Sequence, residues 1–139
     1  MDTILIAADG PASLAALAPA TEIARRWQGN VVLVHTGGLD DAERSRIHAL
    51  IDELRSSGVE ADLELPSASV APASAIIVES AQRRGASVIL LATGPCTAAG
   101  RGAGRSITQS VLDAAPCRVV VVPPPSILER PLRAAGGSA

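Results

Sequence analysis

The chain has 139 residues, a length that favours a single domain. Its formal net charge of −2 gives no electrostatic reason to expect binding to nucleic acid or to an anionic membrane. All twelve basic residues are arginine, so mechanisms that need a P-loop lysine or a Schiff-base lysine are excluded. The absence of Phe and Tyr excludes aromatic platforms for single-stranded nucleic acid. Apolar runs are too short for the roughly 18 residues of a spanning helix, and we expect a cytoplasmic protein without a signal peptide or membrane insertion.

The first part of the chain predicts a strand followed by a helix. The apolar run at residues 3–8 stops at an Asp-Gly-Pro sequence, which is typical of a buried strand. Apolar residues at helical spacing predict a helix over residues 13–28, with Ser13 as its N-cap and Trp27 on its apolar face. Pro19 lies beyond the first turn of that helix, so we expect a bend there.

The next part predicts a second strand, a second helix and an edge strand. Residues 31–34 form another apolar run, and a His-Thr-Gly-Gly loop follows it. Asp40 or Asp41 caps the following helix, which ends at Gly58. Residues 59–65 alternate apolar and acidic side chains, as expected of a strand with one solvated face at a sheet edge.

The second half of the chain repeats the alternation around a glycine-rich segment. We predict a helix over residues 72–84, a strand at 87–91 and a strand at 118–122. Between them, residues 93–105 carry glycines and arginines and read as a loop, and Ser106 begins the next helix in capping-box form. A strand, a glycine-rich loop and a helix in succession are a common phosphate cradle, and a plain flexible connection is the alternative.

Strands that alternate with helices predict an α/β fold with a parallel sheet covered on both faces. The domain is expected to span residues 1–125, and residues 126–139 are expected to form a flexible tail. In such sheets, ligands bind beyond the carboxyl ends of the strands, where the strand order reverses. If the first and fourth strands are neighbours there, the loop at Asp9 and the glycine-rich loop face each other.

Four segments of the chain resemble the universal stress protein family: ILIAADGPASLAAL, VVLVHT, SVILLATG and SITQSVLDAAPCRVVVV, which together cover roughly residues 3–123. The resemblance implies a single Rossmann-like domain whose five parallel strands follow the order 3-2-1-4-5. It also implies ATP or AMP as ligand, with Asp9 near the nucleotide and Thr36 offering backbone atoms to adenine. Dimers through the fifth strand are implied as well.

The glycine motif of this chain departs from that of the ATP-binding members, which is G-x2-G-x9-G-[S/T]. Counting back from the matched Ala-Pro-Cys places Ser106 at the hydroxyl position, and the three glycine positions fall on Ala92, Pro95 and Arg105. A shift by one residue aligns two glycines but places Arg105 at the hydroxyl position. The nucleotide-binding residues that we predict are Asp9, Thr36, Thr93, Gly94, Gly104, Arg105 and Ser106.

The altered motif on an otherwise good match favours a non-catalytic stress or signalling module that acts through self-association or an unidentified protein partner, with weakened or lost nucleotide binding. An adenine-nucleotide sensor is the first alternative. A slow nucleotide hydrolase, with Asp9 or His35 as its general base, is the second. The valine-rich stretch Val119–Val122 would lie on a sheet edge in this order, and a bare edge predicts a homodimer. No metal site is predicted.

Overall fold

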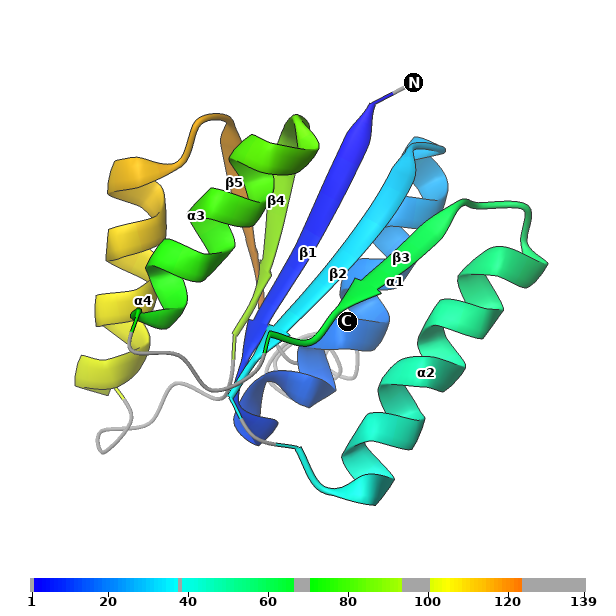
Figure 1. The fold of residues 1–139 in the computed structure, drawn as a ribbon, viewed down its shortest axis with the longest axis horizontal. Coiled ribbons are helices and arrows are strands. Elements are labelled where there is room, and N and C mark those ends of the chain that lie inside the picture. The colour runs from blue at the N-terminus through cyan, green and yellow to red at the C-terminus, as the bar shows by residue number, and fades with distance from the viewer. Residues whose placement is uncertain (1, 38, 67–70, 94–100, 124–139) are drawn as a thin grey trace, which may run out of the picture.

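The computed structural model describes residues 2–37, 39–66, 71–93 and 101–123, with only the backbone given for residues 11–12 and 101–106 (Figure 1). Its centre is one sheet of five parallel strands in the order β3-β2-β1-β4-β5. The strands are β1 (Thr3–Asp9), β2 (Asn30–Thr36), β3 (Ala61–Glu64), β4 (Ala86–Ala92) and β5 (Arg118–Val122). The predicted fold class and strand order are confirmed.

Helices cover both faces of the sheet. They are the 3-10 helix η1 (Pro11–Ala16) and the α-helices α1 (Leu17–Trp27), α2 (Asp41–Ser56), α3 (Ala73–Arg84) and α4 (Arg101–Ala114). One core lies between the sheet and the α1–α2 layer, and the other lies between the sheet and the α3–α4 layer (Figure 1). None of the helices in the described part combines the length and apolar character that a membrane crossing needs.

The central strand β1 supplies side chains to both cores. Ile4 and Ile6 belong to the α1–α2 side, whereas Leu5 and Ala7 belong to the α3–α4 side. Successive side chains of a strand point to opposite faces, so a strand covered on both faces must be apolar throughout. This is why residues 4–8 form an uninterrupted apolar run, and why the run predicted a buried strand.

The predicted helix over residues 13–28 is two elements. Residues 11–16 form η1, and α1 begins only at Leu17, which places Pro19 in its first turn. A backbone N–H there has no intrahelical partner, so the proline removes no helical bond and the expected bend is not needed. Ser13 is not an N-cap, because its hydroxyl donates to backbone carbonyls instead. Trp27 is 49% exposed rather than buried.

The beginnings and ends of α2 and α3 follow the predicted signals closely. Asp40 accepts from the Glu43 N–H, and the Glu43 side chain accepts from the Asp40 N–H, which completes a capping box. Gly58, just after the end of α2, has a φ of 87°. Gly85 ends α3 in the left-handed conformation.

The edge strand β3 is shorter than predicted, Ala61–Glu64 instead of residues 59–65. Two other boundaries also differ from the sequence prediction. β2 continues through His35 and Thr36, which were expected in a loop, because they pair with the last residues of β1. α4 begins at Arg101, so residues 101–105 are helical rather than part of a loop. Glycine costs about 1 kcal/mol in a helix but does not forbid it, and helix propagation from a packed segment proceeds through such residues.

Candidate functional site

The predicted ligand edge of the sheet brings two of the predicted residues into contact. β1 and β2 end side by side, with Asp9 paired to Thr36, at the lower edge of the sheet in Figure 1. By strand alternation both side chains lie on the α3–α4 side. β4 pairs with the other side of β1 and ends at Ala92, so Thr93 follows at the same edge. The predicted juxtaposition of the first and fourth strands is confirmed.

Thr36 orients the carboxylate of Asp9. Its Oγ1 donates to Asp9 Oδ1 at 2.5 Å and also lies 3.3 Å from the Ala8 carbonyl oxygen. The backbone links the same two strand ends, because the Gly10 N–H donates to the Thr36 carbonyl oxygen at 2.9 Å. Hydrogen bonds to a charged acceptor are stronger than neutral ones, so one carboxylate oxygen is held firmly. No described residue donates to the other oxygen, Oδ2.

Two glycines allow the turns after β1 and β2 to approach each other. Gly10 has a φ of 73°, and Gly37 has a φ of 89°. A Cβ at residue 37 would stand 3.3 Å from the nitrogen of Gly10 and 3.5 Å from Asp9 Oδ1. A side chain at residue 37 would therefore crowd the carboxylate and adopt a backbone conformation that disfavours it.

The turn that carries Asp9 is supported from its other side by His35 and Ser13. His35 Nε2 lies 3.0 Å from the Gly10 carbonyl oxygen, and Ser13 Oγ donates to that same oxygen at 3.0 Å. Ser13 Oγ also lies 3.1 Å from the carbonyl oxygen of Asp9. Burial lowers the pKa of His35 below its ordinary 6.5, against the opposing effects of the Gly10 carbonyl, Asp9 and Glu43. His35 is 1% exposed, so it is a support for the turn and not a base open to substrate.

Thr93 is engaged with the neighbouring strand. Its backbone N–H donates to the Val122 carbonyl oxygen at 3.0 Å, and its Oγ1 lies 3.3 Å from the same oxygen. Both donors are directed toward the end of β5. Thr93 thus lies at the expected edge, while its hydrogen-bonding groups secure the junction of β4 and β5.

The remaining predicted residues divide into two groups. Gly94 lies outside the described residues, and so does most of the glycine-rich segment. Gly104, Arg105 and Ser106 lie inside α4, which corrects the prediction that the first two belong to a loop and that Ser106 caps the helix. In a helix that begins at Arg101, the N–H groups of residues 105 and 106 point to carbonyls one turn earlier. Those two amides are therefore not free to cradle a phosphate.

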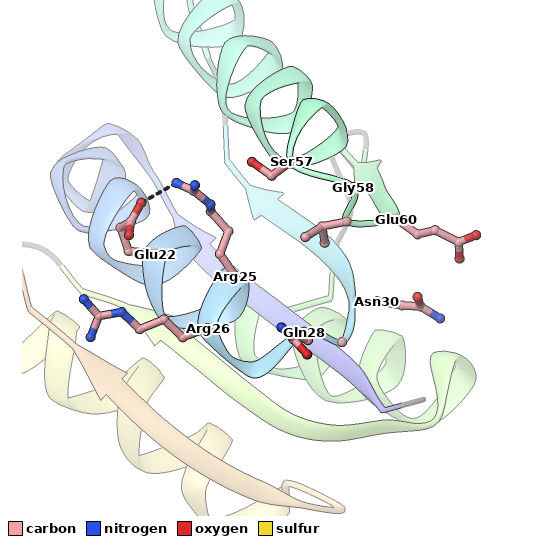
Figure 2. A pocket seen from close by; sticks show the side chains of 10 residues that line it. Glu22, Arg25, Arg26, Gln28, Asn30, Ser57, Gly58 and Glu60 are labelled. Carbon is pink, nitrogen blue, oxygen red and sulfur yellow. Dashed lines mark hydrogen bonds and ion pairs between the residues drawn. The ribbon is translucent and has the colours of Figure 1, made fainter.

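A hollow of about 840 Å³ lies at the opposite, amino-terminal edge of the sheet (Figure 2). It is bordered by the end of α1 and the turn between α2 and β3. Arg25 pairs with Glu22 at 2.6 Å, and the side chains of Arg26 and Glu60 point away from each other in Figure 2. Polar groups that diverge do not define a ligand, so this hollow is a surface depression rather than a candidate site. Within the described residues, no cluster of acidic, His or Cys side chains is suited to hold a metal.

Solved structures with this fold include several universal stress proteins. UspA from Lactobacillus plantarum is 25% identical, with a TM-score of 0.59, over 87% of this chain and 97% of that one. A universal stress protein in complex with cAMP is 20% identical, with a TM-score of 0.61, over 88% and 97%. One from Archaeoglobus fulgidus is 20% identical, with a TM-score of 0.63, over 88% and 98%. The resemblance noted in the sequence is thus confirmed at the level of the fold.

No protein-family model matches the sequence, and no curated protein matches it. The ligands bound in these structures are therefore properties of those proteins alone.

Proposed function

We propose that this chain, which has the fold of the universal stress proteins, is a non-catalytic signalling module that self-associates through β5 and binds adenine nucleotide with weakened affinity. The observation that carries the proposal is the difference between the two edges of the sheet. One edge is protected by charge, and the other carries four valines after a single exposed arginine, Arg118.

The two edge strands differ in what they present to solvent. On β3, Asp62 and Glu64 are tied to arginines of α3, which places charge along that edge. On β5, Val121 is 44% exposed, and Leu112 of the neighbouring α4 is exposed as well. Charged edges resist pairing with another strand, whereas an apolar edge with free backbone groups favours it. A second copy of β5 is the partner that such an edge fits best.

Sedimentation velocity tests the self-association. We expect a dimer at micromolar concentration, and we expect Val121→Lys to shift it to monomer because a lysine on the edge opposes strand pairing. Trp27→Lys is the matched control, since it also replaces an exposed apolar side chain with lysine but lies on α1. A wild-type chain that stays monomeric at high micromolar concentration would contradict this part of the proposal.

The nucleotide part of the proposal is supported by the contact between Asp9 and Thr36 and by the cAMP complex of a protein with the same fold. The expected weakness has two sources. The glycine motif is out of register, and α4 begins early enough to engage the amides of Arg105 and Ser106. Asp9 would orient the ribose hydroxyls through Oδ2, whereas the amides of Arg105 and Ser106 would be engaged within α4.

Two measurements test the nucleotide part. Protein purified without added nucleotide is denatured, and the supernatant is separated against ATP, ADP and AMP standards; we expect far less than one nucleotide per chain. Calorimetric titration with ATP, AMP and cAMP should then give a Kd weaker than about 10 µM. Near-stoichiometric retained nucleotide would instead establish the second candidate, a true adenine-nucleotide sensor. Absence of binding at millimolar nucleotide would contradict nucleotide binding altogether.

The hypothesis of an adenine-nucleotide sensor makes its own prediction about the Asp9 carboxylate. Asp9→Ala should weaken nucleotide binding at least several-fold if Asp9 holds the ribose side, and unchanged affinity would count against this site. The hypothesis of a slow nucleotide hydrolase predicts that the wild-type chain releases phosphate from a nucleotide and that Asp9→Asn does not. The burial of His35 supports our preference for a non-catalytic role, because it separates the imidazole from a bound substrate.

A further inference from the structure

The turn between β1 and η1 is held by hydrogen bonds to the backbone of Gly10 that come from within the protein. The carbonyl oxygen of Gly10 accepts from both His35 Nε2, at 3.0 Å, and Ser13 Oγ, at 3.0 Å. The N–H of the same residue donates to the Thr36 carbonyl. Gly10 has a φ of 73°, so this turn is held in a conformation that few residues adopt. Asp9 immediately precedes the turn, and its position depends on it.

The hydrogen bond defines which nitrogen of His35 carries the proton. A carbonyl oxygen only accepts, so Nε2 must be the donor. In the neutral ring the proton is then on Nε2, and Nδ1 carries a lone pair. The structure thus assigns a single tautomer to His35.

The other ring nitrogen is buried without a partner. Among the described residues, no group hydrogen-bonds to His35 Nδ1. The ring lies on the α1–α2 side of the sheet, because His35 alternates with Thr36 along β2, and the charges that act on its pKa are Asp9 on β1 and Glu43 on α2. A leucine would fill such a place without leaving a buried acceptor unsatisfied. What the imidazole adds is its hydrogen bond to the turn.

We propose that His35 is the positioning residue of the ligand edge: its Nε2–H donates to the Gly10 carbonyl and thereby fixes the turn that presents the Asp9 carboxylate. His35 and Ser13 hold the turn from one side of the sheet, and Thr36 holds the carboxylate from the other. For its effect on affinity, the inference rests on the proposed nucleotide binding. For the geometry of the turn, it stands independently.

Three substitutions separate the hydrogen bond from simple filling of space. His35→Gln carries an amide nitrogen about as far from the backbone as Nε2, so it can donate to the Gly10 carbonyl. His35→Asn places its amide nitrogen near Nδ1 and cannot reach that oxygen. His35→Leu fills the space without a donor. Ile4→Val is the stability control, because Ile4 is a core residue at the amino end of β1, away from the turn.

The first readout is nuclear magnetic resonance of the wild-type chain. Ring nitrogen shifts at pH 7 should show the Nε2–H tautomer. Hydrogen exchange at the Gly10 amide should accelerate at least about tenfold in His35→Leu and His35→Asn, and stay within about threefold of wild type in His35→Gln and Ile4→Val. Calorimetric titration with AMP should follow the same order, with roughly tenfold weaker binding where the donor is lost.

Each outcome decides the proposal. An Nδ1–H tautomer at pH 7 would overturn it, and so would equal exchange in the Gln and Asn variants. If the wild-type chain binds no adenine nucleotide, the proposed nucleotide function fails, while the tautomer and the exchange series still decide whether His35 fixes the turn. If AMP binds but the Leu variant binds equally well, the positioning role fails and the nucleotide function stands.

Discussion

Replacing Glu64 with glutamine tests whether one shielded carboxylate locks the β3 edge onto α3. The Glu64 side chain is 16% exposed and accepts hydrogen bonds from Ser80 at 2.8 Å and from Arg84 Nε at 2.7 Å. Arg83 adds two longer contacts of 3.2 Å. A glutamine keeps the shape of the side chain but loses its charge and one acceptor, so the substitution isolates the electrostatic part.

The magnitude follows from the pKa of the carboxyl group. Burial raises the pKa of Glu64, but hydrogen bonds from Arg83, Ser80 and Arg84 outweigh burial and lower it from 4.5 to about 2. This difference corresponds to about 3 kcal/mol of folded-state stability at neutral pH. Arg83 is 55% exposed, so solvent screening reduces its share. We expect Glu64→Gln to lower the free energy of unfolding by about 1–3 kcal/mol.

Urea denaturation at several pH values measures the effect. Because the folded pKa lies below the unfolded one, the stabilisation is present above pH 4.5 and is lost as the pH falls through about 2. The gap between wild type and Glu64→Gln should therefore be widest at pH 7 and narrow below pH 4.5. Asp62→Asn is the matched control: Asp62 is 63% exposed and pairs only with Arg84 in the described network, so its loss should cost less than about 1 kcal/mol.

Two results would refute this reasoning. One is a Glu64→Gln variant as stable at pH 7 as Asp62→Asn. The other is a stability gap that stays constant on acidification, since that would show a packing effect rather than an effect of charge.

Three further predictions concern the backbone turns and His35. Gly37→Ala should lower the free energy of unfolding by about 1–2 kcal/mol in urea denaturation, because residue 37 has a φ of 89° and a Cβ would crowd Gly10; an unchanged value would show that the turns can separate freely. Gln28→Gly should raise the free energy of unfolding by about 0.5–1 kcal/mol in the same assay, because Gln28 ends α1 at a φ of 54°, which glycine adopts more easily than glutamine. A loss of stability would contradict this. Finally, wild-type stability should fall as the pH drops below 6.5, since the folded pKa of His35 lies under that unfolded value and the unfolded chain takes up the proton first. His35→Gln should lack that part of the slope, and an identical pH profile for both proteins would argue against a buried neutral ring.

Much of the fold could be predicted from local sequence patterns. The apolar runs of β1, β2 and β4 predicted buried strands because a strand covered on both faces needs apolar side chains at every position. The capping box at Asp40 and Glu43 marked the start of α2, because a cap satisfies helix amides that nothing else would satisfy. Signals of this kind act over three or four residues and depend little on the rest of the chain.

Predictions failed where the neighbouring elements decide the outcome. Trp27 repeats at helical spacing, yet it is the last residue of α1 and stays exposed, so periodicity overstated its burial. The glycines after Arg101 favoured a loop, but helix propagation overrides propensity in that segment. His35 and Thr36 were assigned to a loop because their residue types do not prolong an apolar run, although β1 supplies the partners that keep them in β2.

Local sequence patterns predicted the fold class, the family resemblance implied the strand order, and both pointed to Asp9 as a candidate ligand residue. How Asp9 is held depends on residues that are distant in sequence. Thr36 and His35 are 27 and 25 residues away in sequence from the groups that they contact, and the parallel register of β1 and β2 brings them together. One face of β2 then orients the Asp9 carboxylate and the other secures the Gly10 turn, because adjacent residues of a strand point to opposite sides of the sheet.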